Sequence, residues 1–214
     1  MSIWHLCSAF VTAYLLGSIP TAIWYGEAFY GIDIRRFGSG NAGATNTFRV
    51  LGKRAGTIVL LIDVLKGWTA TKLANILLFL EVIPDSDLLN YKLFLGFAAV
   101  LGHLYPVFAK FRGGKGVATS LGMVLAIAPE VALVCVLVFL VVLVVSHYVS
   151  LSSMIAALFF PMLLLFEVFD DSSTLLLCFG FLLSAIVVLT HRKNIIRLLN
   201  GNETPTYLWP KRVK

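Results

Sequence analysis

The hydrophobic positions of the chain fall into long runs rather than into the one-sided patterns of a soluble fold. Apolar stretches cover residues 3–24, 57–80, 91–109, 152–166 and 173–190, and polar segments separate them. A helix needs about 20 predominantly apolar residues to cross a bilayer, and most of these stretches come near that length. The pattern therefore predicts an all-α fold, a polytopic bundle of membrane-spanning helices.

The apolar run between Gly116 and His147 has two interpretations. Pro129 and Glu130 interrupt it, and a proline beside an acid is typical of a turn. Two spans folded at this turn would be short for a bilayer, so a re-entrant pair that does not reach the far side is the alternative. The first interpretation gives seven crossings and the second gives five. In both, the N-terminus lies outside and the C-terminus lies in the cytoplasm.

Composition supports a membrane protein. Of 214 residues, 59% are hydrophobic and 13% are charged, more apolar side chain than one soluble core would bury. No segment reads as a linker, so we expect residues 1–214 to form a single membrane domain that acts as a monomer. The cysteines, Cys7, Cys135 and Cys178, lie inside apolar runs and are expected to pack there, without a disulfide framework or a metal site.

The charges are distributed unevenly along the chain. Of 17 lysines and arginines, 14 lie in residues 35–54, 110–115 and 192–214, and most acids lie in residues 81–87 and 130–171. Basic loops of membrane proteins face the cytoplasm, so this distribution gives the orientation stated above. The net charge of +6 then reflects membrane topology, and no nucleic acid partner is predicted.

One polar segment, GSGNAGATNTFRVLGK at residues 38–53, combines glycines, neutral donors and cations. Glycine-rich backbone and helix N-termini bind anions, and Arg49 would lie one turn beyond Thr45 on the same helix face. A flexible loop with a helix cap is the alternative, but such a loop would not need so many donors. No βαβ unit surrounds the G-x-G-x-x-G pattern, so it is not a dinucleotide fingerprint. The candidate anion ligands are Ser39, Gly40, Asn41, Gly43, Thr45, Asn46 and Arg49.

A second segment, GHLYPVFAKFRGGKGVATSLG at residues 102–122, places Lys115 among three glycines. An ammonium on a glycine-rich backbone predicts a phosphate site, although the spacing is not that of a Walker A loop. Lipid-facing cations are the alternative, which would explain Lys110 and Arg112 but not the glycines. We expect His103 to be a packed, hydrogen-bonded histidine rather than a catalytic one.

The third segment, HRKNIIRLLNGNE at residues 191–203, places His191 and Asn194 on one helix face. His191 is the best acid–base candidate, and a polar stop after the last span explains it equally well. Residues 202–204 form a glycosylation sequon that the cytoplasmic location makes irrelevant. In the polar turn SHYVSLSS, the hydroxyls of Ser150 and Ser153 serve either a ligand or the cap of the next helix.

Asp63 and Lys66 lie three residues apart inside an apolar stretch. Buried charges in a bilayer must be neutralised, so we expect them to pair, in a structural role.

In order and spacing, GSIPTA, GSGNAGATNTFRVLG, GHLYPVFAKFRGGKGVATSLG, VSLSS and HRKNIIRLLNGNE resemble the PlsY family of bacterial acyl-phosphate:glycerol-3-phosphate acyltransferases. The resemblance runs from about residue 14 to residue 203. It implies an enzyme of the bacterial inner membrane, with its active site on the cytoplasmic side. It also implies transfer of a fatty acyl group from acyl phosphate to the 1-hydroxyl of glycerol 3-phosphate, which gives lysophosphatidic acid and phosphate in the first step of phospholipid synthesis.

The resemblance also implies residue roles, without a cofactor or metal. His191 would orient or deprotonate the attacking hydroxyl, and Ser39 would bind rather than act as a nucleophile. The acyl phosphate ligands would be Ser39, Gly40, Asn41, Gly43, Thr45 and Asn46. The glycerol 3-phosphate ligands would be Arg49, Lys115, Asn194, His191 and one of Ser150 or Ser153. The alternatives are a transporter of a phosphorylated solute, which a midplane site on repeated halves would indicate, and a structural lipid-binding protein.

Overall fold

The structure, a computed structural model, describes residues 3–165 and 173–207. Within these residues all regular elements are helical, which confirms the all-α prediction. The acidic turn with Glu167, Asp170 and Asp171 and the terminal cations Lys211, Arg212 and Lys214 lie outside the described residues. The longer helices are α1 (Ile3–Ser18), α2 (Thr21–Tyr30), α3 (Ala44–Phe79), α4 (Leu88–Leu104), α5 (Val117–Ile127), α6 (Pro129–Ser146), α7 (Val149–Leu165), α8 (Thr174–Thr190) and α9 (Arg192–Leu199). Short 3-10 turns are η1 (Ile34–Arg36), η2 (Asp85–Asp87) and η3 (Val107–Ala109).

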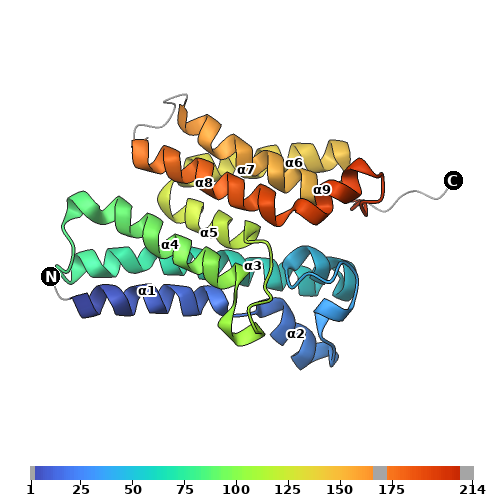
Figure 1. Cartoon of the computed structure of the whole chain (residues 1–214), viewed down its shortest axis with the longest axis horizontal. Coiled ribbons are helices and arrows are strands. Elements are labelled where there is room, and N and C mark those ends of the chain that lie inside the picture. Colours follow the sequence, from blue (N-terminus) through green and yellow to red (C-terminus); the bar gives the residue numbers. More distant parts are fainter. Residues whose placement is uncertain (1–2, 166–172, 208–214) are drawn as a thin grey trace. The chain divides into compact units, whose positions relative to one another are not determined.

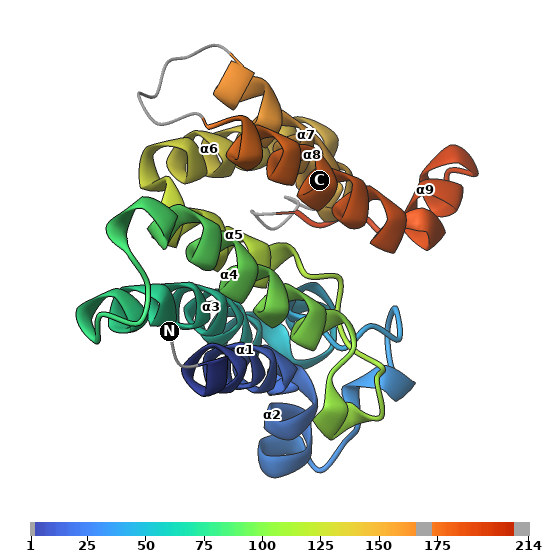
Figure 2. The same ribbon diagram turned by 60° about the vertical axis from the view of Figure 1, so that its left-hand side comes forward.

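The helices form two compact units, residues 1–128 with α1 to α5 and residues 129–214 with α6 to α9 (Figure 1). In the first unit α3 packs against α5, α4 and α1, and α1 packs against α4. In the second unit α7 packs between α6 and α8 (Figure 2). That residues 1–214 act as one domain remains a prediction.

The first predicted span, residues 3–24, is not one continuous helix. Helix α1 ends at Ser18, α2 begins at Thr21, and the two axes differ by 44°. Pro20 has no N–H to donate and its ring collides with the preceding turn, which explains the break. The break matters because it leaves carbonyl groups that the helix itself does not satisfy.

Helix α3 joins two predicted features, the helix that follows the first glycine-rich segment and the span at residues 57–80. It begins at Ala44 and bends at Gly52, whose φ of 86° lies in the left-handed region. Only glycine adopts that conformation without strain, so Gly52 permits the bend. Phe48, before the bend, packs closely on Gly56 after it. A Cβ at Gly56 would overlap the phenyl ring, so the absence of a side chain there allows this contact.

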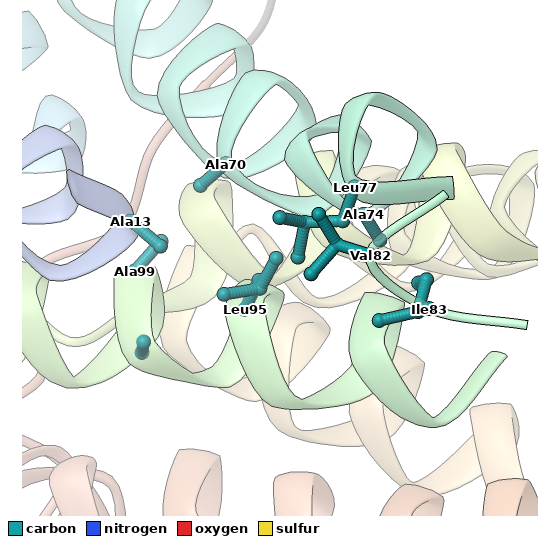
Figure 3. Close-up of a cluster of buried hydrophobic side chains, with 9 residues drawn as sticks. Ala13, Ala70, Ala74, Leu77, Val82, Ile83, Leu95 and Ala99 are labelled. Carbon is teal, nitrogen blue, oxygen red and sulfur yellow. The ribbon is translucent and has the colours of Figure 1, made fainter. Parts of the chain in front are cut away.

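Small residues set the helix spacing in the first unit. A Cβ at Gly67 of α3 would overlap the carbonyl of Thr119, and a Cβ at Gly122 of α5 would overlap that of Val64. This reciprocal contact is the close backbone approach that glycine allows in membrane helices. Figure 3 shows the apolar cluster that α1, α3 and α4 enclose nearby, with Ala13, Ala70, Ala74, Leu77, Leu95 and Ala99 among its buried members.

Two segments, Asp85–Ala109 and Pro129–Ser146, are long and apolar enough to cross a membrane alone. The bent pairs α1 with α2 and α8 with α9 also meet this criterion when each is taken as one span. Helix α6 has 18 residues, whereas α5 has 11, so the predicted pair is unequal in length. The choice between seven crossings and five remains a prediction, as does the orientation.

Candidate active site

The loop before α3 is organised by a single buried amide, that of Asn46. Its Nδ2 donates to the carbonyls of Ile34 and Phe37, each at 3.1 Å. Its Oδ1 accepts from the backbone N–H of Ser39 at 2.8 Å and from the Ser39 hydroxyl at 3.1 Å. Because both amide hydrogens are used on the loop, Asn46 shapes the path of residues 34–39.

The remaining candidate ligands of this loop surround the start of α3. Ser39, Gly40, Thr45 and Arg49 are exposed, and Asn41 and Gly43 are half-buried. The N-cap residue, Gly43, has no side chain that could accept a hydrogen bond from the first turn. A helix N-terminus carries partial positive charge, and Arg49 adds a full charge one turn further on, so the electrostatics of this place are favourable for an anion.

The second glycine-rich segment folds back on the end of α4. The N–H of Gly113 donates to the carbonyl of Leu104 at 3.2 Å, and that of Gly114 donates to the carbonyl of His103 at 3.1 Å. Gly116, with φ of 84°, is the N-cap of α5. Lys115 is therefore held between two fixed points, the end of α4 and the start of α5, and it is half-buried.

The two glycine-rich segments meet in the first unit. Ala42 from the first and Gly113 and Gly114 from the second line the same pocket. Arg35 in η1 also donates from Nη1 to the carbonyl of Ala109 in η3, at 3.3 Å. The two glycine-rich segments thus lie next to each other in the first unit.

Arg35 is itself fixed by an ion pair with Asp33, with Nη2 and Oδ2 2.8 Å apart. The hydrogen bond from the Arg35 side chain holds the pKa of the Asp33 carboxyl below its ordinary value, against the effect of desolvation. The same hydrogen bond raises the pKa of the Arg35 guanidinium. The connection between the two segments therefore stays charged at neutral pH.

A buried polar cluster lies at the same pocket. Lys66 Nζ lies 2.8 Å from Asp63 Oδ1, which confirms the predicted ion pair, and Lys66 also donates to the carbonyl of Ile19 at 2.9 Å. The hydroxyl of Thr21 donates to Asp63 Oδ1 at 3.0 Å, and His103 Nδ1 lies 3.7 Å from the same oxygen. His103 is buried, as expected. Lys66 and Asp63 together satisfy polar groups at the helix break around Pro20, namely the carbonyl of Ile19 and the hydroxyl of Thr21.

In the second unit a buried carboxylate, that of Glu203, gathers three side chains. Glu203 Oε1 accepts from Asn194 Nδ2 at 2.8 Å and from the Ser150 hydroxyl at 3.1 Å, and Oε2 accepts from Arg197 Nε at 2.7 Å. Burial raises the pKa of the Glu203 carboxyl, but the hydrogen bonds from these three side chains outweigh burial, so that pKa lies below its ordinary value. The carboxylate therefore stays ionised and fixes Asn194 relative to α7.

His191 lies where the axis of α8 bends by 60° into α9. His191 and Asn194 are 2% and 5% exposed, whereas Arg192 and Lys193 are exposed, so the predicted common face exists. His191 Nδ1 lies 2.7 Å from the carbonyl of Val187. A carbonyl can only accept, so Nδ1 carries a hydrogen, and in the neutral form of the ring Nε2 is then the nitrogen without one.

The two candidate serines of α7 differ in their partners. The hydroxyl of Ser150 donates to Glu203, whereas that of Ser153 donates to the carbonyl of Val149 in its own helix, at 2.8 Å. Both side chains are buried. Each hydroxyl hydrogen is thus engaged, and each oxygen retains lone-pair capacity to accept a hydrogen bond from a ligand.

Glu203 has no predicted role, because in the sequence it is only the centre of the glycosylation sequon at residues 202–204. The signal was nevertheless present, since an acid that follows the cations Arg192, Lys193 and Arg197 has nearby partners for a buried charge. Gly201, with φ of 68°, turns the chain after α9 and brings Glu203 back toward α7. A turn of this kind is not visible in the hydrophobic pattern.

Comparison with known proteins gives consistent results over nearly the whole chain. The model of the family described as glycerol-3-phosphate acyltransferase matches residues 7–201. A glycerol-3-phosphate acyltransferase of Geobacillus kaustophilus is 52% identical over 198 residues, which are 92% of this chain and 94% of that protein. One of Chlorobaculum tepidum is 44% identical over 216 residues, covering 90% of this chain and 93% of that protein.

Two solved structures are similar in fold as well as in sequence. Both are crystal structures of PlsY, described as an integral membrane glycerol 3-phosphate acyltransferase. The glycerol 3-phosphate form is 39% identical, covers 94% of this chain and 95% of that one, and has a TM-score of 0.80. The lysophosphatidic acid form has a TM-score of 0.79 at the same identity, with 93% and 94% of the two chains covered.

Proposed function

The chain belongs to the glycerol-3-phosphate acyltransferase family, and on this premise we propose that it transfers a fatty acyl group from acyl phosphate to the 1-hydroxyl of glycerol 3-phosphate. Acyl phosphate is a mixed anhydride, already activated, so no covalent enzyme intermediate is required. The glycerol oxygen forms an ester bond to the carbonyl carbon, and the bond from that carbon to the phosphate oxygen breaks. Phosphate leaves with the electron pair, and the products are lysophosphatidic acid and inorganic phosphate.

The first glycine-rich segment binds the acyl phosphate in this proposal. Ser39, Gly40, Asn41, Gly43 and Thr45 offer hydroxyl, amide and backbone donors around the start of α3. Negative charge grows on the phosphate as it departs, so donors fixed at that place favour the transition state over the ground state. Asn46 takes part by holding Ser39 in position.

Arg49, Lys115 and Asn194, with one of Ser150 or Ser153, hold the glycerol 3-phosphate. Arg49 and Lys115 are cations from two segments that line one pocket, and a phosphate dianion needs such neutralisation. The lone pairs of a buried serine oxygen suit a glycerol hydroxyl, which must donate.

His191 accepts the proton of the attacking hydroxyl. Its Nδ1 lies 2.7 Å from a backbone carbonyl, which leaves Nε2 as the basic atom of the neutral ring. The departing phosphate is the alternative proton acceptor, and His191 would then orient the hydroxyl only. The two roles differ in how far turnover falls without the imidazole.

The observation that carries the proposal is the meeting of Ala42 with Gly113 and Gly114 at one pocket, in a chain of this family. The test uses purified protein with palmitoyl phosphate and glycerol 3-phosphate, without added metal. Lysophosphatidic acid and phosphate are expected in equal amounts. Palmitoyl-CoA and palmitoyl-acyl carrier protein are the comparison donors. Direct transfer from either donor in the absence of acyl phosphate would overturn the donor assignment. Family membership already favours an enzyme over the transporter.

The proposed location is the bacterial cytoplasmic membrane, with the active site on the cytoplasmic side. Its support is the gathering of Arg35, Arg36, Arg49, Lys110 and Arg112 around the two glycine-rich segments, since cationic loops stay in the cytoplasm.

A further inference from the structure

The proposed reaction does not use the most deeply buried ionisable side chains described in the first unit. Asp63, Lys66 and His103 are 1%, 5% and 6% exposed, and they come from helices α3 and α4. Polar groups placed in an apolar bundle lower its stability unless they are fully paired, so a second purpose for them is worth seeking.

This buried cluster lies next to the second glycine-rich segment, at the pocket that Gly113 and Gly114 also line. The carbonyl of His103 accepts the N–H of Gly114 at 3.1 Å, and a Cβ at Gly114 would overlap Nε2 of the imidazole. Nδ1 of the same ring lies 3.7 Å from Asp63 Oδ1. The imidazole therefore separates the Asp63 carboxylate from the backbone that carries Lys115.

The opposite side of the cluster fixes the helix break at Pro20. Lys66 donates to the carbonyl of Ile19, and Thr21 donates to Asp63 Oδ1. Removal of the cluster would thus free two structures together, the α1–α2 corner and the seat of Gly114. A salt bridge that merely balanced two charges would not need contacts to both the α1–α2 corner and the Gly114 backbone.

We propose that Asp63, Lys66 and His103 are positioning residues, which hold Gly113 and Gly114 so that Lys115 is placed to bind the phosphate of glycerol 3-phosphate. Asp63 and Lys66 fix the imidazole of His103 against the α1–α2 corner, and the imidazole supports Gly114. The inference rests on the proposed function, because it takes Lys115 as a ligand of this substrate.

The test compares His103→Ala, His103→Gln and the charge-neutral double variant Asp63→Asn/Lys66→Met with the unmodified chain. His103→Ala is expected to raise the KM for glycerol 3-phosphate about tenfold or more, with the KM for palmitoyl phosphate within about twofold. His103→Gln retains a long polar side chain and is expected to recover part of the loss. The double variant is expected to share the raised KM, although its charges still balance.

A core variant separates positioning from loss of stability. Leu95, 2% exposed, lies two turns before His103 on α4, and Leu95→Ala is expected to lower the melting temperature without changing either KM. If Leu95→Ala and His103→Ala changed both KM values alike, the role of His103 would be structural only, and the inference would be overturned.

Pairing with Lys115→Ala gives the decisive measurement. If His103 acts through Lys115, His103→Ala should add less than about twofold to the loss in kcat/KM that Lys115→Ala already causes. Fully multiplicative losses would overturn the inference and leave the proposed function intact. A separate measurement, equilibrium binding of glycerol 3-phosphate without any acyl donor, tests whether Lys115 is a ligand of this substrate. If Lys115→Ala leaves that binding unchanged, it is the ligand assignment in the proposed function that fails, and the positioning inference with it.

Discussion

The amide oxygen of Asn46 accepts both the backbone N–H and the hydroxyl of Ser39, at 2.8 and 3.1 Å. The two residues are seven positions apart in the chain. The glycines on either side of Ser39, Gly38 and Gly40, have φ of 59° and 73°. Asn46 and Ser39 are both predicted ligands, and in the structure Asn46 holds Ser39 in place. The distinction has measurable consequences.

Replacement of Asn46 by alanine removes the support of Ser39 and of two loop carbonyls. We expect the KM for acyl phosphate to rise about tenfold or more, since loss of a buried network costs about 1–3 kcal/mol. Steady-state kinetics with varied palmitoyl phosphate measures this. Thr47→Val is the control, because the buried Thr47 hydroxyl donates to the carbonyl of Gly43, the N-cap of the same helix, at 3.2 Å. Equal losses in both variants would contradict a specific role of Asn46.

Replacement of His191 by alanine tests its role as a base. We expect kcat to fall by roughly 10²–10⁴, the usual contribution of general base catalysis, with a smaller change in either KM. His147→Asn is the matched control, because the His147 ring packs against Tyr207 and its φ of 62° suits asparagine. Near-normal turnover of His191→Ala would assign the proton to the departing phosphate.

Glu203 should stabilise the second unit in a pH-dependent way. Its pKa is depressed in the folded state, so its contribution is present above the ordinary value of 4.5 and is lost as pH falls through the folded-state value. Glu203→Gln should lower the free energy of unfolding at neutral pH by about 1.5–3 kcal/mol. The melting temperature should fall accordingly. The difference from the unmodified chain should shrink in acid, as measured by thermal unfolding. Glu130→Gln, at an exposed carboxylate, should show no such difference.

The reciprocal contact of α3 with α5 should not tolerate side chains. Gly122→Val places atoms where the carbonyl of Val64 lies, and overpacking of this kind costs about 1–3 kcal/mol or more. We expect a lower melting temperature and less folded protein in membranes. Gly180→Ala is the control, because its Cβ would lie 3.2 Å from a side-chain atom of Pro161, a contact that a small shift relieves.

Labelling with an impermeant thiol reagent can count the crossings. In a chain whose cysteines, Cys7, Cys135 and Cys178, are replaced by alanine, Glu130→Cys should react in intact cells if there are seven crossings. Lys110→Cys should react only after the membrane is opened. Failure of the reagent to label Glu130→Cys in intact cells would support five crossings. Labelling of Lys110→Cys in intact cells would show that the orientation is the reverse of the one predicted.

The hydrophobic runs alone determined that the chain is helical and membrane-bound, because lipid accepts only long apolar segments whose backbone bonds are internal. The three polar segments likewise stood out, since glycines and donors have no reason to interrupt such runs. The pairing of Asp63 with Lys66 followed from spacing alone, and the structure confirms it.

Only the tertiary structure decided which polar side chains hold one another. Asn46 bonds to residues 7 to 12 positions away, and Ser150 bonds to Glu203 across 53 positions. Helical periodicity relates residues three or four apart, so it cannot reveal contacts that depend on a glycine turn or a helix break. The break at Pro20, the bend at Gly52 and the turn at Gly201 place the loops, and side-chain packing in three dimensions then selects their partners.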